Sequence, residues 1–469
     1  MIKLPFAIAL MLLTNAFVSF AQHVEKVPFN DKDYYLAVKP TSGNIKGVLV
    51  LLRGFRDPEV ILSETNLPDV AAANDFLTIL VSTGQKLYAD TVAISRLNQI
   101  LSHVIQVYKP DTSRFAIGAY EFGGTIALRY AELAQAGRMG IPVVPKAVFA
   151  ADSPTDLFNF WNRCEDDFKK NFNAGSVGDA KFILERMRSE NGDIHTNAAR
   201  YKELSPFVVS SDTVGNEQFL HGIGVRMYYD TDINWQLDNR RNSFYGTNIP
   251  DGSELIKRLM LAGHKNAAFI SSRPGMRPNG VRNPNSFSVI EEGDCIRWLK
   301  KSLGIFDPVT WKRPYKIDVP ADWGRELSAF PPDFAPAIPE KGVEDLFFLP
   351  GWGNSHSDEY WSYCYILSLE RKQAPDENEL KKILAAYYDG LVKRNMELVT
   401  PAQVNFKKGT YTGTISMMDY MQKKPIVFNF MVEKKECNTV LFVKISPQPL
   451  GHAVWGKLNA VSSSFRCGE

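Results

Sequence analysis

Hydrophobic residues in the first 300 positions alternate between short, continuous apolar runs and longer stretches with helical spacing. Residues 47–54 (GVLVLLRG) and 76–84 (FLTILVSTG) are almost wholly apolar, as is typical of strands buried on both faces of a sheet. Apolar positions in 91–108 recur at helical spacing, which predicts a helix. Further strands are expected at 115–120, 146–154, 225–235 and 267–275, and helices at 123–135, 253–261 and 291–303. This alternation predicts an α/β fold with a mostly parallel sheet and helices on both faces.

Three segments depart from this alternation and divide the chain. Residues 155–220 are polar, aromatic and helical, which predicts a cap inserted between two strands of the domain at 22–303. Residues 304–341 contain seven prolines, which predicts an extended linker. In 342–469 a strand-like run, a helix, three alternating strands and a closing helix predict a small α+β domain.

The N-terminal segment 1–21 has the pattern of a secretory signal peptide. One cation, Lys3, precedes an apolar run at 4–20, and small residues follow it. A membrane anchor is the alternative, but the run is short and is interrupted by polar residues. We expect cleavage near Gln22 and a secreted or periplasmic protein, since no later segment reaches the ~20 continuous apolar residues that span a bilayer.

The composition excludes one class of partner. Hydrophobic residues make up 45% of the 469 positions and charged residues 23%, which is typical of a chain that buries a large core. The formal net charge is only +2, and the charges of both signs are mixed along the chain. Because no basic stripe is present, we expect no binding to nucleic acid.

Cysteine usage gives little indication of a metal site. The five cysteines are irregularly spaced and none belongs to a CxxC pair, so we expect neither a metal nor a cofactor. Because the number of cysteines is odd, at least one of them has no partner for a disulfide within the chain. A disulfide between Cys437 and Cys467 is expected, because an exported protein can keep such a bond.

One segment carries the signature of a catalytic turn with an altered centre. Residues 119–123 read Ala-Tyr-Glu-Phe-Gly, after an apolar run and before a helical stretch. In its order of parts, the chain from about 40 to 303 resembles the α/β-hydrolase superfamily, in particular secreted serine esterases and peptidases with a helical cap. The matching motif of that superfamily is Gly-x-Ser-x-Gly, in which serine is the nucleophile. Glu121 occupies the position of the serine.

The resemblance also implies positions for the other two members of a catalytic triad. The acid is expected in the loop after 225–235, where Asp230 and Asp232 both qualify and Asp232 is preferred as nearer the end of the strand. The histidine position is matched by Asn285, and residues 267–303 contain no histidine. Of the seven histidines in the chain, His356 is the best candidate to replace it.

The surroundings of Glu121 can be predicted from the same resemblance. Backbone amides near Phe55 and at Phe122 are expected to form an oxyanion hole. A carboxylate at a helix N-terminus is favoured in its ionised form. We therefore expect Glu121 to be ionised and paired with Arg53 or Arg56, since a buried carboxylate needs a cationic partner.

The functional interpretation depends on the two altered triad positions, Glu121 in place of serine and Asn285 in place of histidine. A serine hydroxyl attacks only when a histidine accepts its proton, and removal of either residue costs on the order of a million-fold in turnover. We therefore expect a catalytically degenerate hydrolase that binds a small molecule, peptide or protein, or acts as a scaffold. The alternative is an active hydrolase of esters or peptides in which Glu121 serves as nucleophile or base.

Overall fold

The computed structural model describes residues 24–30, 33–54, 57–332, 334–396, 401–407, 410–437 and 439–468. The chain divides into two compact units, Met1–Ile305 and Phe306–Glu469. The predicted signal peptide at 1–21 lies outside the described residues. Among the residues that are described, no helix combines the length and the apolar character needed to cross a bilayer.

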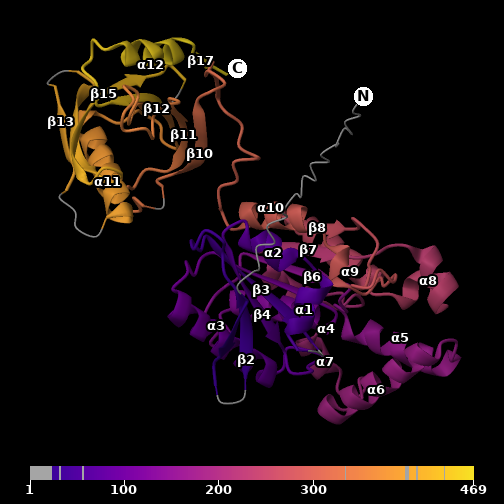
Figure 1. Ribbon diagram of the computed structural model, residues 1–469. Coiled ribbons are helices and arrows are strands. Elements are labelled where there is room, and N and C mark those ends of the chain that lie inside the picture. The colour runs from indigo at the N-terminus through magenta and orange to yellow at the C-terminus, as the bar shows by residue number, and fades with distance from the viewer. Residues whose placement is uncertain are drawn as a thin grey trace, which may run out of the picture. The chain divides into compact units, whose positions relative to one another are not determined.

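The first unit is built on an eight-stranded sheet with the order β1-β2-β4-β3-β5-β6-β7-β8. The first two strands are antiparallel to their neighbours, and all pairings from β4 to β8 are parallel. The expected α/β architecture is therefore confirmed (Figure 1). The strands are β1 (Val24–Pro28), β2 (Tyr34–Val38), β3 (Gly47–Arg53), β4 (Phe76–Ser82), β5 (Phe115–Tyr120), β6 (Ala147–Ala151), β7 (Gly224–Tyr228) and β8 (Ala267–Ile270).

Helices bury both faces of this sheet. Alternate residues of β3 enter different cores: Val48, Val50 and Leu52 pack with helices α3, α4 and α9, whereas Leu49 and Leu51 pack with α1, α2 and α10. This two-sided burial explains why the central strands are apolar at every position. The helices are α1 (Glu59–Glu64), α2 (Leu67–Ala72), α3 (Thr91–Tyr108), α4 (Phe122–Gln135), α9 (Ile249–Leu261) and α10 (Glu292–Ser302).

The segment between β6 and β7 is helical and has a small core of its own. Helix α5 (Leu157–Lys170) packs against α6 (Ala174–Asn191) and α7 (Ala198–Leu204), and 3-10 helix η1 (Asn216–Leu220) leads back to the sheet. Trp161 and Tyr201 are fully buried between these helices. Asp156 and Asn173 begin α5 and α6, because their side chains accept hydrogen bonds from the first backbone amides of each helix.

The segment after β7 corrects one boundary expected from the sequence. A strand was expected to run to 235, but β7 ends at Tyr228 and helix α8 (Ile233–Arg240) begins five residues later. The physical reason is a helix cap: the Asp232 side chain accepts a hydrogen bond from the Trp235 amide. The 3-10 helices η2 (Phe244–Gly246) and η3 (Phe287–Val289) complete this unit.

The second unit is a seven-stranded antiparallel sheet with the order β10-β11-β12-β16-β15-β14-β13. Helix α11 packs against one face and α12 against the other, which confirms the expected α+β class. The predicted bond between Cys437 and Cys467 is present. The elements are β9 (Tyr315–Lys316), β10 (Gly324–Phe330), β11 (Gly342–Phe348), β12 (Tyr363–Leu369), α11 (Glu377–Asn395), β13 (Gln403–Phe406), β14 (Thr412–Asp419), β15 (Lys424–Lys434), β16 (Val440–Ser446), α12 (Ala453–Ser463) and β17 (Arg466–Cys467).

The linker predicted at 304–341 requires a correction. Strand β10 lies within it and pairs along its whole length with β11, and β9 pairs with the C-terminal β17. Neither strand contains a proline, because the prolines of this segment fall before β9, between the two strands or after β10. Most of the segment is therefore part of the second unit.

Candidate functional site

Glu121 stands at the apex of a sharp turn between β5 and α4. Its backbone has φ 51° and ψ −131°, a conformation that costs on the order of 1–3 kcal/mol for a residue other than glycine. The turn is held by hydrogen bonds from the Glu121 amide to the Ala151 carbonyl and from the Gly124 amide to the Glu121 carbonyl. This is the strained strand–turn–helix geometry in which α/β-hydrolases present their nucleophile.

The two glycines after Glu121 are required by close packing. A Cβ at Gly123 would lie 2.8 Å from the Leu52 carbonyl oxygen, and one at Gly124 would lie 1.9 Å from Ser153 Oγ. Neither position has room for a methyl group. These contacts hold the start of α4 against β3 and β6.

Tyr120 links Glu121 to the loop that follows β8. Its hydroxyl lies 2.9 Å from Glu121 Oε1 and also within hydrogen-bonding distance of the Asn285 carbonyl oxygen. A phenol has a single proton, so it donates to one of these oxygens at a time. Burial and the nearby Glu121 carboxylate raise the pKa of Tyr120, so the hydroxyl stays protonated and remains a donor.

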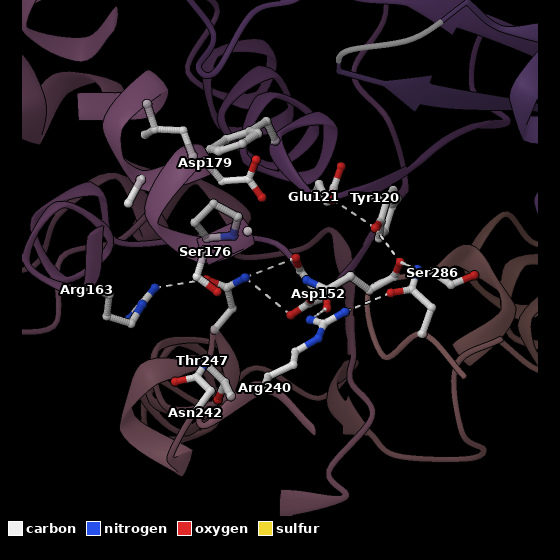
Figure 2. A pocket seen from close by; sticks show the side chains of 18 of the residues that line it. Tyr120, Glu121, Asp152, Arg163, Ser176, Asp179, Arg240, Asn242, Thr247 and Ser286 are labelled. Atoms are coloured by element: carbon white, nitrogen blue, oxygen red, sulfur yellow. Dashed lines mark hydrogen bonds between the residues drawn. The ribbon is translucent and has the colours of Figure 1, made fainter. Parts of the chain in front are cut away.

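A cavity of about 850 Å³ opens next to Glu121, beyond the carboxyl ends of β5 and β6. Ligands of α/β sheets bind at this edge, and small-molecule sites have volumes of about 300–1,000 Å³. Helices α5, α6 and α8 and the residues 277–286 supply much of the remaining lining. Figure 2 shows that carboxylate, guanidinium and amide side chains surround this space.

Asp152 is a second carboxylate in the cavity, one residue beyond the end of β6. It also has a left-handed backbone, with φ 42°, and its Oδ1 accepts a hydrogen bond from Asn248 Nδ2 at 3.3 Å. Burial is the main cause that raises the pKa of Asp152 to about 6; the hydrogen bond from Asn248 opposes the rise, and the charge of Glu121 adds a smaller increase. Such a carboxyl gains and loses its proton near neutral pH.

The acid position after β7 is tied to an arginine. Asp230 is buried and accepts hydrogen bonds from the Gly275 amide at 2.9 Å and from both terminal nitrogens of Arg282. Asp232 is exposed, caps α8 and lies 3.1 Å from Arg282 Nη2. Of the two aspartates considered from the sequence, Asp230 is the one that points inward. Arg282 comes from the loop after β8, which in the superfamily supplies the histidine.

Asn285, the residue matched to the histidine, lies in the wall of the cavity. Its Oδ1 accepts a hydrogen bond from Arg240, which also donates to Asn283 Oδ1 at 2.9 Å. Arg240 additionally packs over the ring of Trp235. Asn285 is thus brought to the neighbouring residues Tyr120 and Glu121, although it lies more than 160 residues after them in the sequence.

The other residues named from the sequence fall in different places. Arg53 forms an ion pair with Glu64 at 2.6 Å and lies over the Tyr120 ring. Phe122 is buried and its ring contacts Phe160. Phe55 and Arg56 lie outside the described residues, so the oxyanion hole and the pairing of Glu121 with either arginine stay predictions.

No histidine is among the described residues that line the cavity. His103 contacts the Tyr35 hydroxyl, and His264 lies against the carbonyls of Leu220 and Ile223 at the opposite edge of the sheet. His195 is exposed in the cap. His356 is exposed in the second unit. Within the same described ranges, no group of histidine, cysteine and carboxylate side chains is arranged to hold a metal ion.

Four residues at this site went unnoticed in the sequence: Asp152, Gln236, Arg240 and Arg282. Asp152 follows an apolar strand directly, and this position could have identified it as a residue at the ligand-binding edge. The other three lie in a helix and a loop whose pattern is that of ordinary surface sequence. Only the folded chain brings Gln236 and Arg240 to the cavity and Arg282 to Asp230.

Comparisons with known proteins give structural neighbours only. No protein-family model matches the chain, and no curated protein matches its sequence. A fungal esterase from Rhizomucor miehei aligns with 61% of this chain and 85% of its own at 14% identity, with a TM-score of 0.40. A Pyrococcus horikoshii acylaminoacyl peptidase aligns with 61% of this chain and 42% of its own at 12% identity, also with a TM-score of 0.40.

An esterase/lipase from an uncultured bacterium is similar over 60% of this chain and 85% of its own, at 14% identity and a TM-score of 0.39. At these values the likeness says nothing about activity. The strand order, the antiparallel β2 and the sharp turn at Glu121 come from the chain itself. By these features the first unit has the α/β-hydrolase fold.

Proposed function

We propose that the protein is an exported α/β-hydrolase-fold protein that no longer carries out serine-type hydrolysis and binds a ligand or partner in the cavity beside Glu121. The observation that carries the proposal is the carboxylate at the apex of the turn, in contact with Tyr120. A carboxylate is acceptor-only when ionised, and at this position it gives no hydroxyl nucleophile.

The geometry around Asp230 supports the same proposal. In a serine hydrolase the acid orients the histidine and stabilises its charged form. Here the inward-facing acid is occupied by Arg282 and by the Gly275 amide. A guanidinium does not lose its proton in proteins, so Arg282 cannot serve as the general base.

The alternative is catalysis by carboxylates. Glu121 would attack a substrate, and Asp152, whose pKa lies at about 6, would exchange protons with it. Paired carboxylates whose environments separate their pKa values are typical of enzymes that use one as an acid or base.

Hydrolysis assays separate the two functions. Full-length protein without its signal segment is tested on short p-nitrophenyl esters and on N-acyl dipeptide amides, beside Glu121→Gln. We expect rates equal to those of buffer for both proteins. Turnover by the wild type that is lost in Glu121→Gln would refute the binding function and support the alternative. Intact-mass analysis of the exported protein checks the expected mature N-terminus near Gln22.

A further inference from the structure

Glu344 is a carboxyl buried in the interior of the second unit. It lies on β11, is only 2% exposed, and shares a face of the strand with Leu346, which belongs to the core beneath α11. Its Oε1 accepts a hydrogen bond at 2.8 Å from Ser328 Oγ, directly opposite on β10. Its Oε2 is buried and makes no hydrogen bond within the residues that the structure describes. Only one of the two carboxyl oxygens is therefore satisfied.

The polar surroundings of Glu344 contain hydroxyls and a like charge. They are Ser328 and Glu326 on β10, Tyr363 and Tyr365 on β12, and Tyr387 on α11. Among the described residues, none of the groups that act on this carboxyl is a cation. A buried carboxylate without a cationic partner is costly in free energy, so such a group tends to keep its proton.

Glu344 is the buried group of this cluster whose charge changes near neutral pH. Burial raises its pKa from 4.5 to about 7; the hydrogen bonds of Ser328 and Tyr387 oppose the rise, and the charge of Glu326 adds to it. Burial also raises the pKa values of the three tyrosines far above neutral, so their hydroxyls stay protonated. The Tyr365 hydroxyl is a second buried polar group without a hydrogen-bond partner in the described chain.

Helix α11 is the element that covers this carboxyl. Tyr387 of α11 lies next to Glu344, and its ring stacks on the Tyr365 ring with centroids 6.0 Å apart. The helix begins with a capping box, in which Asp376 and Glu379 each accept a hydrogen bond from the backbone amide of the other. Because this cap is local to the helix, α11 can keep its own structure when its packing on the sheet weakens.

We propose that Glu344 is a proton-controlled switch for the docking of α11: the neutral carboxyl lets the helix pack on β10, β11 and β12, and ionisation loosens the helix from the sheet. The proton passes to solvent, and water reaches Oε2 once the helix has moved. Because folding raises the pKa of Glu344, docking is strongest below about pH 4.5, weakens as the pH rises to about 7, and changes little above that. The switch lies in the second unit and does not rest on the binding function proposed for the first.

Hydrogen–deuterium exchange of the full-length mature protein at pH 6 and pH 8, measured by mass spectrometry, tests the switch. After correction for intrinsic exchange rates, the amides of α11 should lose protection by about tenfold between these pH values. The reason is that the loosened state has released the proton at both, whereas the docked state releases it only near pH 7. Helix α12, which packs on the opposite face of the same sheet, should keep its protection. An equal loss in α12 would contradict a switch that acts on α11.

Glu344→Gln supplies the decisive variant, because the amide keeps an acceptor for Ser328 and stays neutral at every pH. Its α11 protection should be the same at pH 6 and pH 8. The matched control is Glu326→Gln, which alters the exposed carboxylate of β10 and should keep most of the pH-dependent loss. Unchanged protection in the wild type, or a tenfold loss that persists in Glu344→Gln, would overturn the switch. If Glu344→Gln fails to fold, Glu344→Met provides the neutral side chain, with the same two outcomes.

Discussion

Replacement of Asp152 by Asn gives a quantitative test of the electrostatics in the cavity. The pKa of this carboxyl rises from 3.8 to about 6 on folding, because burial and the charge of Glu121 disfavour its ionised form. The difference of about two pKa units corresponds to about 3 kcal/mol. Asn keeps the oxygen that accepts the hydrogen bond from Asn248 and removes the charge.

Because folding raises the pKa of Asp152, the direction in which stability changes with pH can be worked out. Between about pH 4 and pH 6 the folded protein holds a proton on Asp152 that the unfolded chain has released, so the stability contributed by this group falls as pH rises. Below pH 4 the wild type and Asp152→Asn should differ little. Above pH 6 the variant should be more stable by up to about 3 kcal/mol.

Urea denaturation of both full-length proteins, at pH values from about 4 to 8, measures this difference. The unfolding transition of the first unit must be monitored separately, because the two units need not unfold together. In a Glu121→Gln background the gain from Asp152→Asn should shrink, since one cause of the shift is gone. A difference that is constant with pH, or a variant that is less stable at pH 8, would refute the raised pKa of Asp152, and an undiminished gain in the Glu121→Gln background would refute the repulsion between the two carboxylates.

Two further changes test the support of the turn and of the loop after β8. Gly124→Ala should destabilise the protein by about 2 kcal/mol or more, because its Cβ would lie 1.9 Å from Ser153 Oγ, and Ser153→Gly should recover part of the loss in the double variant. A neutral Gly124→Ala would contradict the close packing at the start of α4. Arg282→Met should cost about 3 kcal/mol in urea denaturation, because it leaves the buried Asp230 carboxylate without its cation. The exposed Arg277→Met in the same loop is the control, and equal losses in the two variants would contradict the specific role of Arg282.

The first unit was predictable because its strands are buried on both faces. Strands such as β3 and β4 have no polar positions in their interiors except Thr78, and this pattern is readable without a structure. The edge strand β10 is mostly exposed, and its neighbouring prolines suggested a linker. Sequence pattern reports burial, so an exposed strand gives a weak signal even when it is fully paired.

The candidate site was only partly predictable for a different reason. Glu121 is recognisable because the turn imposes small residues at fixed spacing around it. Asp152, Gln236 and Arg282 are set by tertiary contacts between separate segments, which leave no local pattern. The choice between Asp230 and Asp232 depended on where β7 ends, and the helix cap at Asp232 ends the strand earlier than its hydrophobic residues suggest.

The central claim is that Glu121 occupies the nucleophile position without turning over a substrate. A carboxylate nucleophile forms an acyl intermediate, and when water attacks that intermediate at the carboxyl of the glutamate an oxygen from solvent enters its side chain. Full-length protein incubated with p-nitrophenyl acetate in ¹⁸O-water, then digested and analysed by mass spectrometry, tests this directly. We expect the peptide containing Glu121 to keep its natural mass, and a gain of ¹⁸O in that peptide as product accumulates would contradict the proposed loss of catalysis.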